Sequence, residues 1–313
     1  MTTNRPPVCD YEGSDYQTSF WDAGGRSYED GAEAVALRRL LPPAGKLLIE
    51  FGAGAGRNTP RYQGFERIVL LDYSRTQLEQ AQARLGNSSR YVYVAADIYQ
   101  LPFRPGVFDA ATMIRTLHHM ADAPLALQQV RQVLQPQATF ILEFANKHNL
   151  KSILRYLLRL QAWSPFTLEA VEFAKLNFDF HPRAVRQWLS HCDFVIERQL
   201  TVSHFRINLF KRFLPTSWLI NMDSFAQLTG DWWQLAPSVF VRCRAGGSPA
   251  RPVQNDAIEI IFCCPECRHT PLEVSPYPGN LHSLRAEVCG SRGDLRFSPT
   301  SLGALFLHHP KMR

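Results

Sequence analysis

Apolar runs alternate with amphipathic stretches through most of the chain. An apolar run of strand length predicts a strand buried in a parallel sheet, and apolar positions spaced three to four residues apart predict a helix. The predicted strands are 47–51, 67–71, 91–96, 108–114, 138–144, 194–204 and 238–244, and the predicted helices are 32–41, 58–63, 76–85, 122–136 and the segment after Pro182. This alternation predicts an α/β fold with a doubly wound, mostly parallel sheet.

A glycine-rich turn follows the first strand. The strand ends in Glu50, and Gly52, Gly54 and Gly56 come next. Glycine lets the backbone turn sharply and come close to a ligand because no Cβ intervenes. The spacing is G-x-G-x-G, which differs from the G-x-G-x-x-G pattern of dinucleotide-binding proteins. The turn therefore indicates a ligand site without the phosphate-binding pattern of a dehydrogenase.

Acidic residues end the next two predicted strands. Asp72 lies 22 positions after Glu50 (72 − 50), about the length of one βαβ unit. A carboxylate there can accept hydrogen bonds from both hydroxyls of a ribose. Ser74 begins a capping box for the following helix, which leaves Asp72 for a ligand. Asp97 ends the third strand and can accept a hydrogen bond from an exocyclic amine, while Ile98 can pack on the face of a purine.

Four motifs in this order, E-F-G-A-G-A-G, L-L-D-Y-S, A-A-D-I and F-D-A-A-T-M-I-R-T-L-H-H, resemble those of class I S-adenosylmethionine-dependent methyltransferases. The similarity is greatest to the small-molecule branch that includes quinone-type methyltransferases. It covers residues 30–150 closely and extends more loosely to 245. The resemblance implies a Rossmann-like fold whose last strand is antiparallel at the end of the sheet.

The resemblance also implies S-adenosylmethionine as the cofactor. It assigns the methionine part to the glycine turn, the ribose to Asp72 and the adenine to Asp97 and Ile98, with the residues near Arg115–His119 between cofactor and substrate. The expected cofactor-binding residues are Glu50, Gly52, Ala53, Gly54, Gly56, Asp72, Tyr73, Asp97, Ile98 and Arg115.

Methyl transfer from a sulfonium is an in-line displacement, so the protein must mainly position the acceptor and exclude water. A general base is needed only if the acceptor loses a proton. His118 and His119 follow the fourth strand and are the first candidates for this role. His148, Asp179 and His181 are alternatives from the insertion after the fifth strand.

Three segments outside the predicted sheet could cover the site. Residues 1–31 contain several aromatic residues and form either a lid or a packed extension. Residues 146–180 and the aromatic residues 205–236 are expected to form a substrate cap, the former as a helical insertion within a methyltransferase domain at 32–245. Lys151, Arg155 and Arg159 form a basic stripe, which is either a solvated helix face or a contact with membrane or RNA.

The C-terminal part contains a cysteine motif. Residues 246–257 have the composition of a linker, and 258–313 are expected to form a small zinc-ribbon-like module with a tail. Cys264 and Cys267 match one knuckle and Cys289 the end of a second, but Ala286 stands where the fourth ligand belongs. Either the chain binds zinc with an unclear fourth ligand, or the ribbon has lost its metal. The alternative ligands are Cys263, His269 and His282.

Composition narrows the function only coarsely. The hydrophobic fraction is 45% and the formal charge is +6, which allows an acidic or anionic partner without selecting one. The sequence shows no secretory signal and no apolar run long enough to span a membrane, so we expect a soluble cytoplasmic protein.

We expect methyl transfer to a small lipophilic or aromatic acceptor. The alternatives are an RNA methyltransferase that uses the ribbon and the basic stripe, and a non-catalytic adaptor that binds the cofactor.

Overall fold

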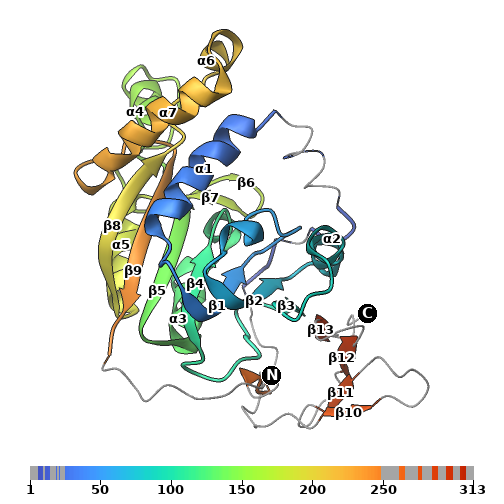
Figure 1. Cartoon of the computed structure of the whole chain (residues 1–313). Helices are drawn as coiled ribbons and strands as arrows, with labels where there is room; N and C mark the ends of the chain where they lie inside the picture. The colour runs from blue at the N-terminus through green and yellow to red at the C-terminus, as the bar shows by residue number, and fades with distance from the viewer. Residues whose placement is uncertain are drawn as a thin grey trace.

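The structure is a computed structural model of the chain (Figure 1). It describes residues 6–9, 11–14, 19, 21, 25–247 and 261–264, together with the backbone of four C-terminal strands. These strands are β10 (Val274–Pro276), β11 (Leu284–Glu287), β12 (Asp294–Ser298) and β13 (Ala304–Leu307).

The centre of the fold is a twisted sheet in the order β3-β2-β1-β4-β5-β9-β8. Its strands are β1 (Gly45–Phe51), β2 (Phe65–Asp72), β3 (Tyr91–Ala95), β4 (Phe108–Met113), β5 (Leu134–Ala145), β8 (Phe194–Val202) and β9 (Ser238–Ala245). The pairs among β3, β2, β1, β4 and β5 are parallel, which confirms the predicted doubly wound α/β fold. The strand β9 is antiparallel as expected, but it lies between β5 and β8 instead of at the end of the sheet.

Helices cover both faces of this sheet. One apolar layer includes residues of α1 (Ser27–Leu40), α2 (Arg75–Leu85) and α7 (Thr216–Ala226), and the other includes residues of α3 (Ala123–Val133) and α5 (Pro182–His191). Side chains cap α2 and α3 as their sequences predict, because Ser74 Oγ accepts from the Gln77 amide at 3.2 Å and Asp122 Oδ1 from the Leu125 amide at 3.0 Å.

The helix predicted at 58–63 is only a short 3₁₀ turn, η2 (Thr59–Arg61). Pro60 at its start lacks an amide hydrogen, and Gly64 leads directly into β2. The helix that was expected to begin in this segment therefore does not continue beyond one turn.

The insertion after β5 contains both a helix and a hairpin. The helix α4 (Leu150–Leu157) is followed by β6 (Val171–Ala174) and β7 (Asn177–Asp179), which pair with each other. After β8 come α6 (Asn208–Phe213), α7 and the 3₁₀ helix η4 (Gln227–Asp231). Figure 1 shows α4, α6 and α7 gathered at one end of the sheet. No helix in the described part of the chain is long and apolar enough to cross a membrane.

The C-terminal strands continue the main sheet. The strand β13 pairs in parallel with β3, and β10 to β13 pair with one another in antiparallel order. Ahead of them, residues 261–264 pack on the loop after β3. The Cys263 amide donates to the Pro102 carbonyl at 3.0 Å, and the buried rings of Phe262 and Phe103 lie 5.4 Å apart. The chain beyond the linker is thus attached to the sheet at two places.

Candidate functional site

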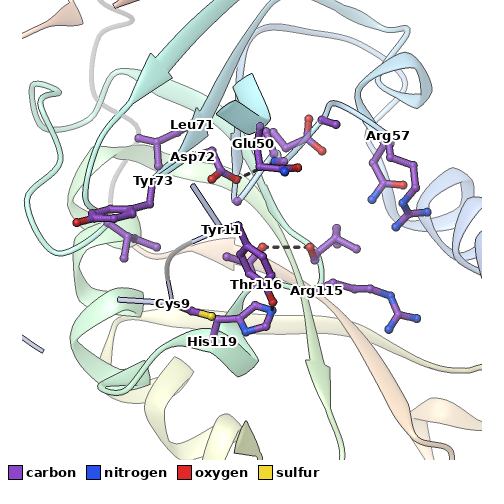
Figure 2. A pocket seen from close by; sticks show the side chains of 18 of the residues that line it. Cys9, Tyr11, Glu50, Arg57, Leu71, Asp72, Tyr73, Arg115, Thr116 and His119 are labelled. Atoms are coloured by element: carbon purple, nitrogen blue, oxygen red, sulfur yellow. Dashed lines mark hydrogen bonds between the residues drawn. The ribbon is translucent and has the colours of Figure 1, made fainter. Parts of the chain in front are cut away.

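A cavity of about 990 Å³, including the open space at its mouth, lies at the carboxyl ends of β1, β2 and β4. Ligands of doubly wound folds bind at this edge of the sheet. The walls come from the glycine turn, the ends of β2 and β4, and residues near the N-terminus. Figure 2 shows Asp72 and Tyr73 on the wall formed by the end of β2, and Tyr11 beside His119.

The glycine turn has a backbone that other residues rarely adopt. Gly52, Gly54 and Gly56 all have positive φ angles, of 64°, 53° and 70°. A Cβ on Gly52 would lie 2.2 Å from Thr116 Oγ1, and one on Gly56 would lie 2.9 Å from Leu85. A Cβ on Gly54 would meet no atom closer than 3.9 Å, so the backbone at Gly54 is open toward a ligand.

Asp72 connects this turn to the end of β2. Its Oδ2 accepts from the Gly54 amide at 2.8 Å, and its Oδ1 accepts from the Ser74 amide at 2.9 Å. Ser74 caps the helix as predicted, but Asp72 is not left wholly to a ligand. The Tyr73 amide also contributes a backbone hydrogen bond, and since a carboxylate offers about four acceptor sites, Asp72 keeps some acceptor capacity. Burial raises the pKa of Asp72.

Glu50 forms the buried floor beneath the turn. It accepts hydrogen bonds from Thr59 Oγ1 at 2.6 Å and from the Tyr62 hydroxyl at 3.0 Å. Burial raises the pKa of Glu50 to about 7, although these two hydroxyl donors oppose the shift. A cationic ligand in the cavity would favour the ionised form of this side chain.

Two arginines of the cavity share one buried carboxylate. Glu33 from α1 accepts from Arg57 at 2.7 Å and from Arg115 Nε at 2.5 Å. Burial alone would raise the pKa of Glu33, but Arg115 and Arg57 hold it below its ordinary value. Arg115 has a positive φ of 55°, and its amide donates to Glu143 at 2.9 Å. The Trp21 ring lies 3.6 Å from the Arg57 guanidinium carbon.

His119 faces the cavity between two oxygen atoms. Its Nδ1 lies 3.4 Å from the Leu176 carbonyl oxygen, and its Nε2 lies 3.3 Å from the Tyr11 hydroxyl. A carbonyl oxygen can only accept, so Nδ1 carries the proton and Nε2 is the acceptor in the neutral ring. Burial lowers the pKa of His119, which favours this neutral form. The ring can therefore receive a proton.

His118 lies behind His119, with the two ring centres 3.9 Å apart, and it does not line the cavity. Its Nδ1 is buried and has no hydrogen-bond partner among the described residues. Burial lowers its pKa well below the ordinary value. The other three candidate bases also lie outside the cavity lining: His148, Asp179 and His181.

The structure brings together most of the residues expected to bind a cofactor. Those lining the cavity are Glu50, Gly52, Ala53, Gly54, Asp72, Tyr73, Ile98 and Arg115. Gly56 and Asp97 do not line it, because Gly56 packs on α2 and the Asp97 carboxylate accepts from the Tyr99 amide at 2.9 Å.

Arg57 and Asn58 also line the cavity and were not among the expected residues, whereas Thr116 lies in the expected range Arg115–His119. Arg57 and Asn58 directly follow the glycine turn and could have been found from that position. No sequence pattern connects Glu33 with Arg57 and Arg115.

Of the expected zinc ligands, only Cys264 is described. It is buried next to Cys263, and no three His, Cys, Asp or Glu residues in the described part of the chain are grouped to hold a metal ion. Cys267 and Cys289 lie outside the described residues, as do the alternatives His269 and His282. The zinc-ribbon-like module stays a prediction.

Comparisons with known proteins agree with this geometry. Residues 49–142 match the protein family described as methyltransferase domain. The chain is 29% identical over 147 residues to the O-methyltransferase cnsE of Penicillium expansum, covering 43% of this chain and 52% of that protein. It is 38% identical over 125 residues to the 2-phytyl-1,4-naphtoquinone methyltransferase of Trichormus variabilis, covering 37% of this chain and 54% of the relative.

A solved structure shares the fold. It comes from the complex of the Haloferax volcanii Trm112 methyltransferase activator with a methyltransferase. It aligns with a TM-score of 0.53 and 15% identity over 74% of this chain and 96% of that chain. The chain therefore shares the fold of this structure and contains, at residues 49–142, a region that matches the methyltransferase domain. The chain spans about half the length of the two curated relatives named above.

Proposed function

We propose that this protein transfers a methyl group from S-adenosylmethionine to a small lipophilic or aromatic acceptor. The observation that carries the proposal is the cavity in which Gly52 and Gly54, both with positive φ, meet the carboxylate of Asp72 at the carboxyl edge of the sheet. The matched methyltransferase domain, residues 49–142, contains both features.

The residues present suit this cofactor. The backbone at Gly54 would admit the methionine part, and the remaining lone pairs of Asp72 would accept the ribose hydroxyls. Ala96 and Ile98 offer an apolar surface for the adenine. Bound S-adenosylmethionine supplies the methyl group on a sulfonium, and S-adenosylhomocysteine is the leaving group.

The protein's part in such a transfer is mainly positioning. The glycine turn and Asp72 are fixed to each other by the hydrogen bond from the Gly54 amide, so one end of the site is rigid. At the other end, His119 is held by the Leu176 carbonyl. For an acceptor that reacts through a hydroxyl, Nε2 of His119 would receive the proton, directly or through Tyr11.

The walls beside His119 favour an apolar acceptor. Val8 and Met120 form a backbone bridge there, and both line the cavity together with Tyr11. The names of the two relatives agree with this chemistry, because one is an O-methyltransferase and the other a methyltransferase of a phytyl-substituted naphthoquinone. We therefore place phenols and alkylated quinols first among the acceptors.

The test combines binding with turnover. Calorimetric titration measures the affinity of the full chain for S-adenosylmethionine and S-adenosylhomocysteine. Transfer of a radiolabelled methyl group is then measured to 1-naphthol, to a 2-alkyl-1,4-naphthoquinol and to transfer RNA. We expect binding of both nucleosides and transfer to at least one of the first two acceptors.

Other outcomes favour other functions. Folded protein that binds neither nucleoside overturns the proposal. Transfer to the RNA alone would support an RNA methyltransferase. Binding without transfer to any of the three acceptors would support a non-catalytic adaptor.

A further inference from the structure

An unusual number of apolar side chains is exposed in the two segments that flank α5 and β8. Among the described residues, all exposed large apolar side chains except Tyr73 and Val195 lie in residues 150–173 and 207–235. The most exposed belong to α4 and its continuation, the end of α6, α7 and the residue after η4. We call these the cap surface, represented by Leu157, Leu158, Phe213, Trp218, Phe225 and Trp232, which are 63–78% exposed.

These elements gather at one end of the molecule (Figure 1). The Leu150 amide at the start of α4 donates to the Leu235 carbonyl at 2.9 Å, which ties the first segment to the end of the second. Because β5 runs from its carboxyl end into α4, this is also the end of the sheet that carries the cofactor cavity. Many large apolar side chains exposed at one end of a protein mark an interaction surface.

The charges exposed on the three helices of the cap surface have one sign, whereas the acidic residues Glu169, Glu172 and Asp231 are exposed elsewhere in the two segments. The exposed charged side chains of α4, α6 and α7 are Lys151, Arg155 and Arg212, all basic, and Arg159 follows α4. The only acidic residue in these three helices is Asp223, which is buried and accepts from the Tyr28 hydroxyl at 3.0 Å. The three helices of the surface therefore combine large apolar side chains with basic ones.

We propose that the cap surface docks this protein on a membrane that contains anionic lipids. Exposed tryptophan, phenylalanine and leucine side chains can enter the boundary between headgroups and acyl chains, while lysine and arginine contact anionic headgroups. Since no described helix can cross a membrane, the contact would be peripheral. A second copy of the chain is a less suitable partner. A twofold contact would place the basic side chains of the two copies near one another, where they repel.

Docking would bring the acceptor side of the site toward the lipid. The hairpin of β6 and β7 follows α4, and the Leu176 carbonyl at its turn holds His119. This consequence rests on the proposed function, since a lipophilic acceptor dissolves in the bilayer and would enter from there. The docking itself depends only on the surface and its charges.

The experiment is co-sedimentation of the full chain with vesicles of phosphatidylcholine alone and of phosphatidylcholine mixed with phosphatidylglycerol. One variant combines Leu157→Ser, Phe213→Ser and Trp218→Ser, and a second combines Lys151→Gln, Arg155→Gln and Arg159→Gln. Val195→Ser is the matched control, because Val195 is also exposed but belongs to β8. Circular dichroism verifies that each variant is folded, and titration with S-adenosylmethionine tests the proposed function on the same samples.

We expect tighter binding to the mixed vesicles. The charge variant should lower the partition coefficient by about a hundredfold, at about fivefold for each basic residue. The apolar variant should abolish binding to both kinds of vesicle, and Val195→Ser should bind like the unchanged protein.

Absence of vesicle binding overturns the proposal. If gel filtration then shows a dimer that the apolar variant dissociates, the cap surface joins two copies of the chain. Equal binding by the unchanged protein and the charge variant would refute the role of anionic lipid. Vesicle binding without any affinity for S-adenosylmethionine would leave the docking standing and refute the proposed function.

Discussion

Substitution of Asp72 by Asn tests the cofactor site with little change in shape. Asp72 accepts from the Gly54 amide through one oxygen and from the Ser74 amide through the other. An Asn side chain has a single oxygen, so its NH₂ group must replace one acceptor. The variant loses one of these backbone hydrogen bonds and also one site that could accept a ribose hydroxyl.

The size of the effect follows from the charge that is lost. A hydrogen bond to a charged group contributes about 1.5–3 kcal/mol. At about 1.4 kcal/mol for each factor of ten, the dissociation constant for S-adenosylmethionine should rise by about 10–150-fold. The lost backbone hydrogen bond should separately lower the free energy of unfolding by about 1–3 kcal/mol.

Asp109 provides a matched control at the opposite end of the sheet. It is the second residue of β4 and accepts hydrogen bonds from the Lys46 and Leu47 amides at 2.7 and 3.0 Å, and burial raises its pKa as it does that of Asp72. It does not line the cavity. Asp109→Asn should lower the stability by a similar amount but leave the affinity for S-adenosylmethionine unchanged.

Calorimetric titration of the folded variants gives their affinities for S-adenosylmethionine, and urea unfolding gives their stabilities. An unchanged affinity in Asp72→Asn would refute the ribose assignment. An equal loss of affinity in both variants would show that the effect is one of stability and not of ligand contact.

Three further results are expected. His119→Gln should lower kcat with a hydroxyl acceptor by about 100-fold or more at unchanged cofactor affinity, and an equal fall of kcat in His118→Gln would contradict this. Because the pKa of Glu50 rises from 4.5 to about 7 on folding, its contribution to stability should fall by about 3 kcal/mol as the pH rises through this range. The difference in unfolding free energy between the unchanged protein and Glu50→Gln at pH 5 and pH 8 measures this fall, and a constant difference refutes it. Phe262→Ala should cost about 3–5 kcal/mol of stability, less than additively with Phe103→Ala, whereas an unchanged unfolding free energy would show that residues 261–264 do not pack on the domain.

Much of the fold was evident from the sequence because it depends on local and periodic features. The strands β1 to β5 and the helices α2 and α3 form where the apolar pattern predicts them, and Ser74 and Asp122 cap the two helices. The glycine turn could be assigned from spacing, since a backbone with positive φ strongly favours glycine. Alternating strands and helices also fix which strand ends meet at one edge of a sheet.

Other features depended on contacts between residues far apart in the chain. The sequence does not reveal that β9 inserts between β5 and β8, because an edge position and an inner position show the same apolar pattern. It does not show that the aromatic residues at 205–236 are mostly exposed, since composition gives no direction to a side chain. Their predicted role as a substrate cap stays untested, although they do not line the cofactor cavity.

The contrast is clearest at the site itself. The sequence placed Asp72 and the glycine turn together, because both follow strands of one βαβ unit. Only the tertiary structure distinguishes His119 from His118 as a candidate base. It does so through the contacts of His119 with the Tyr11 hydroxyl and the Leu176 carbonyl. These partners lie 108 and 57 positions away, and hydrogen bonds over such separations depend on how whole elements pack. Periodicity determines which elements form, whereas packing decides which side chains meet.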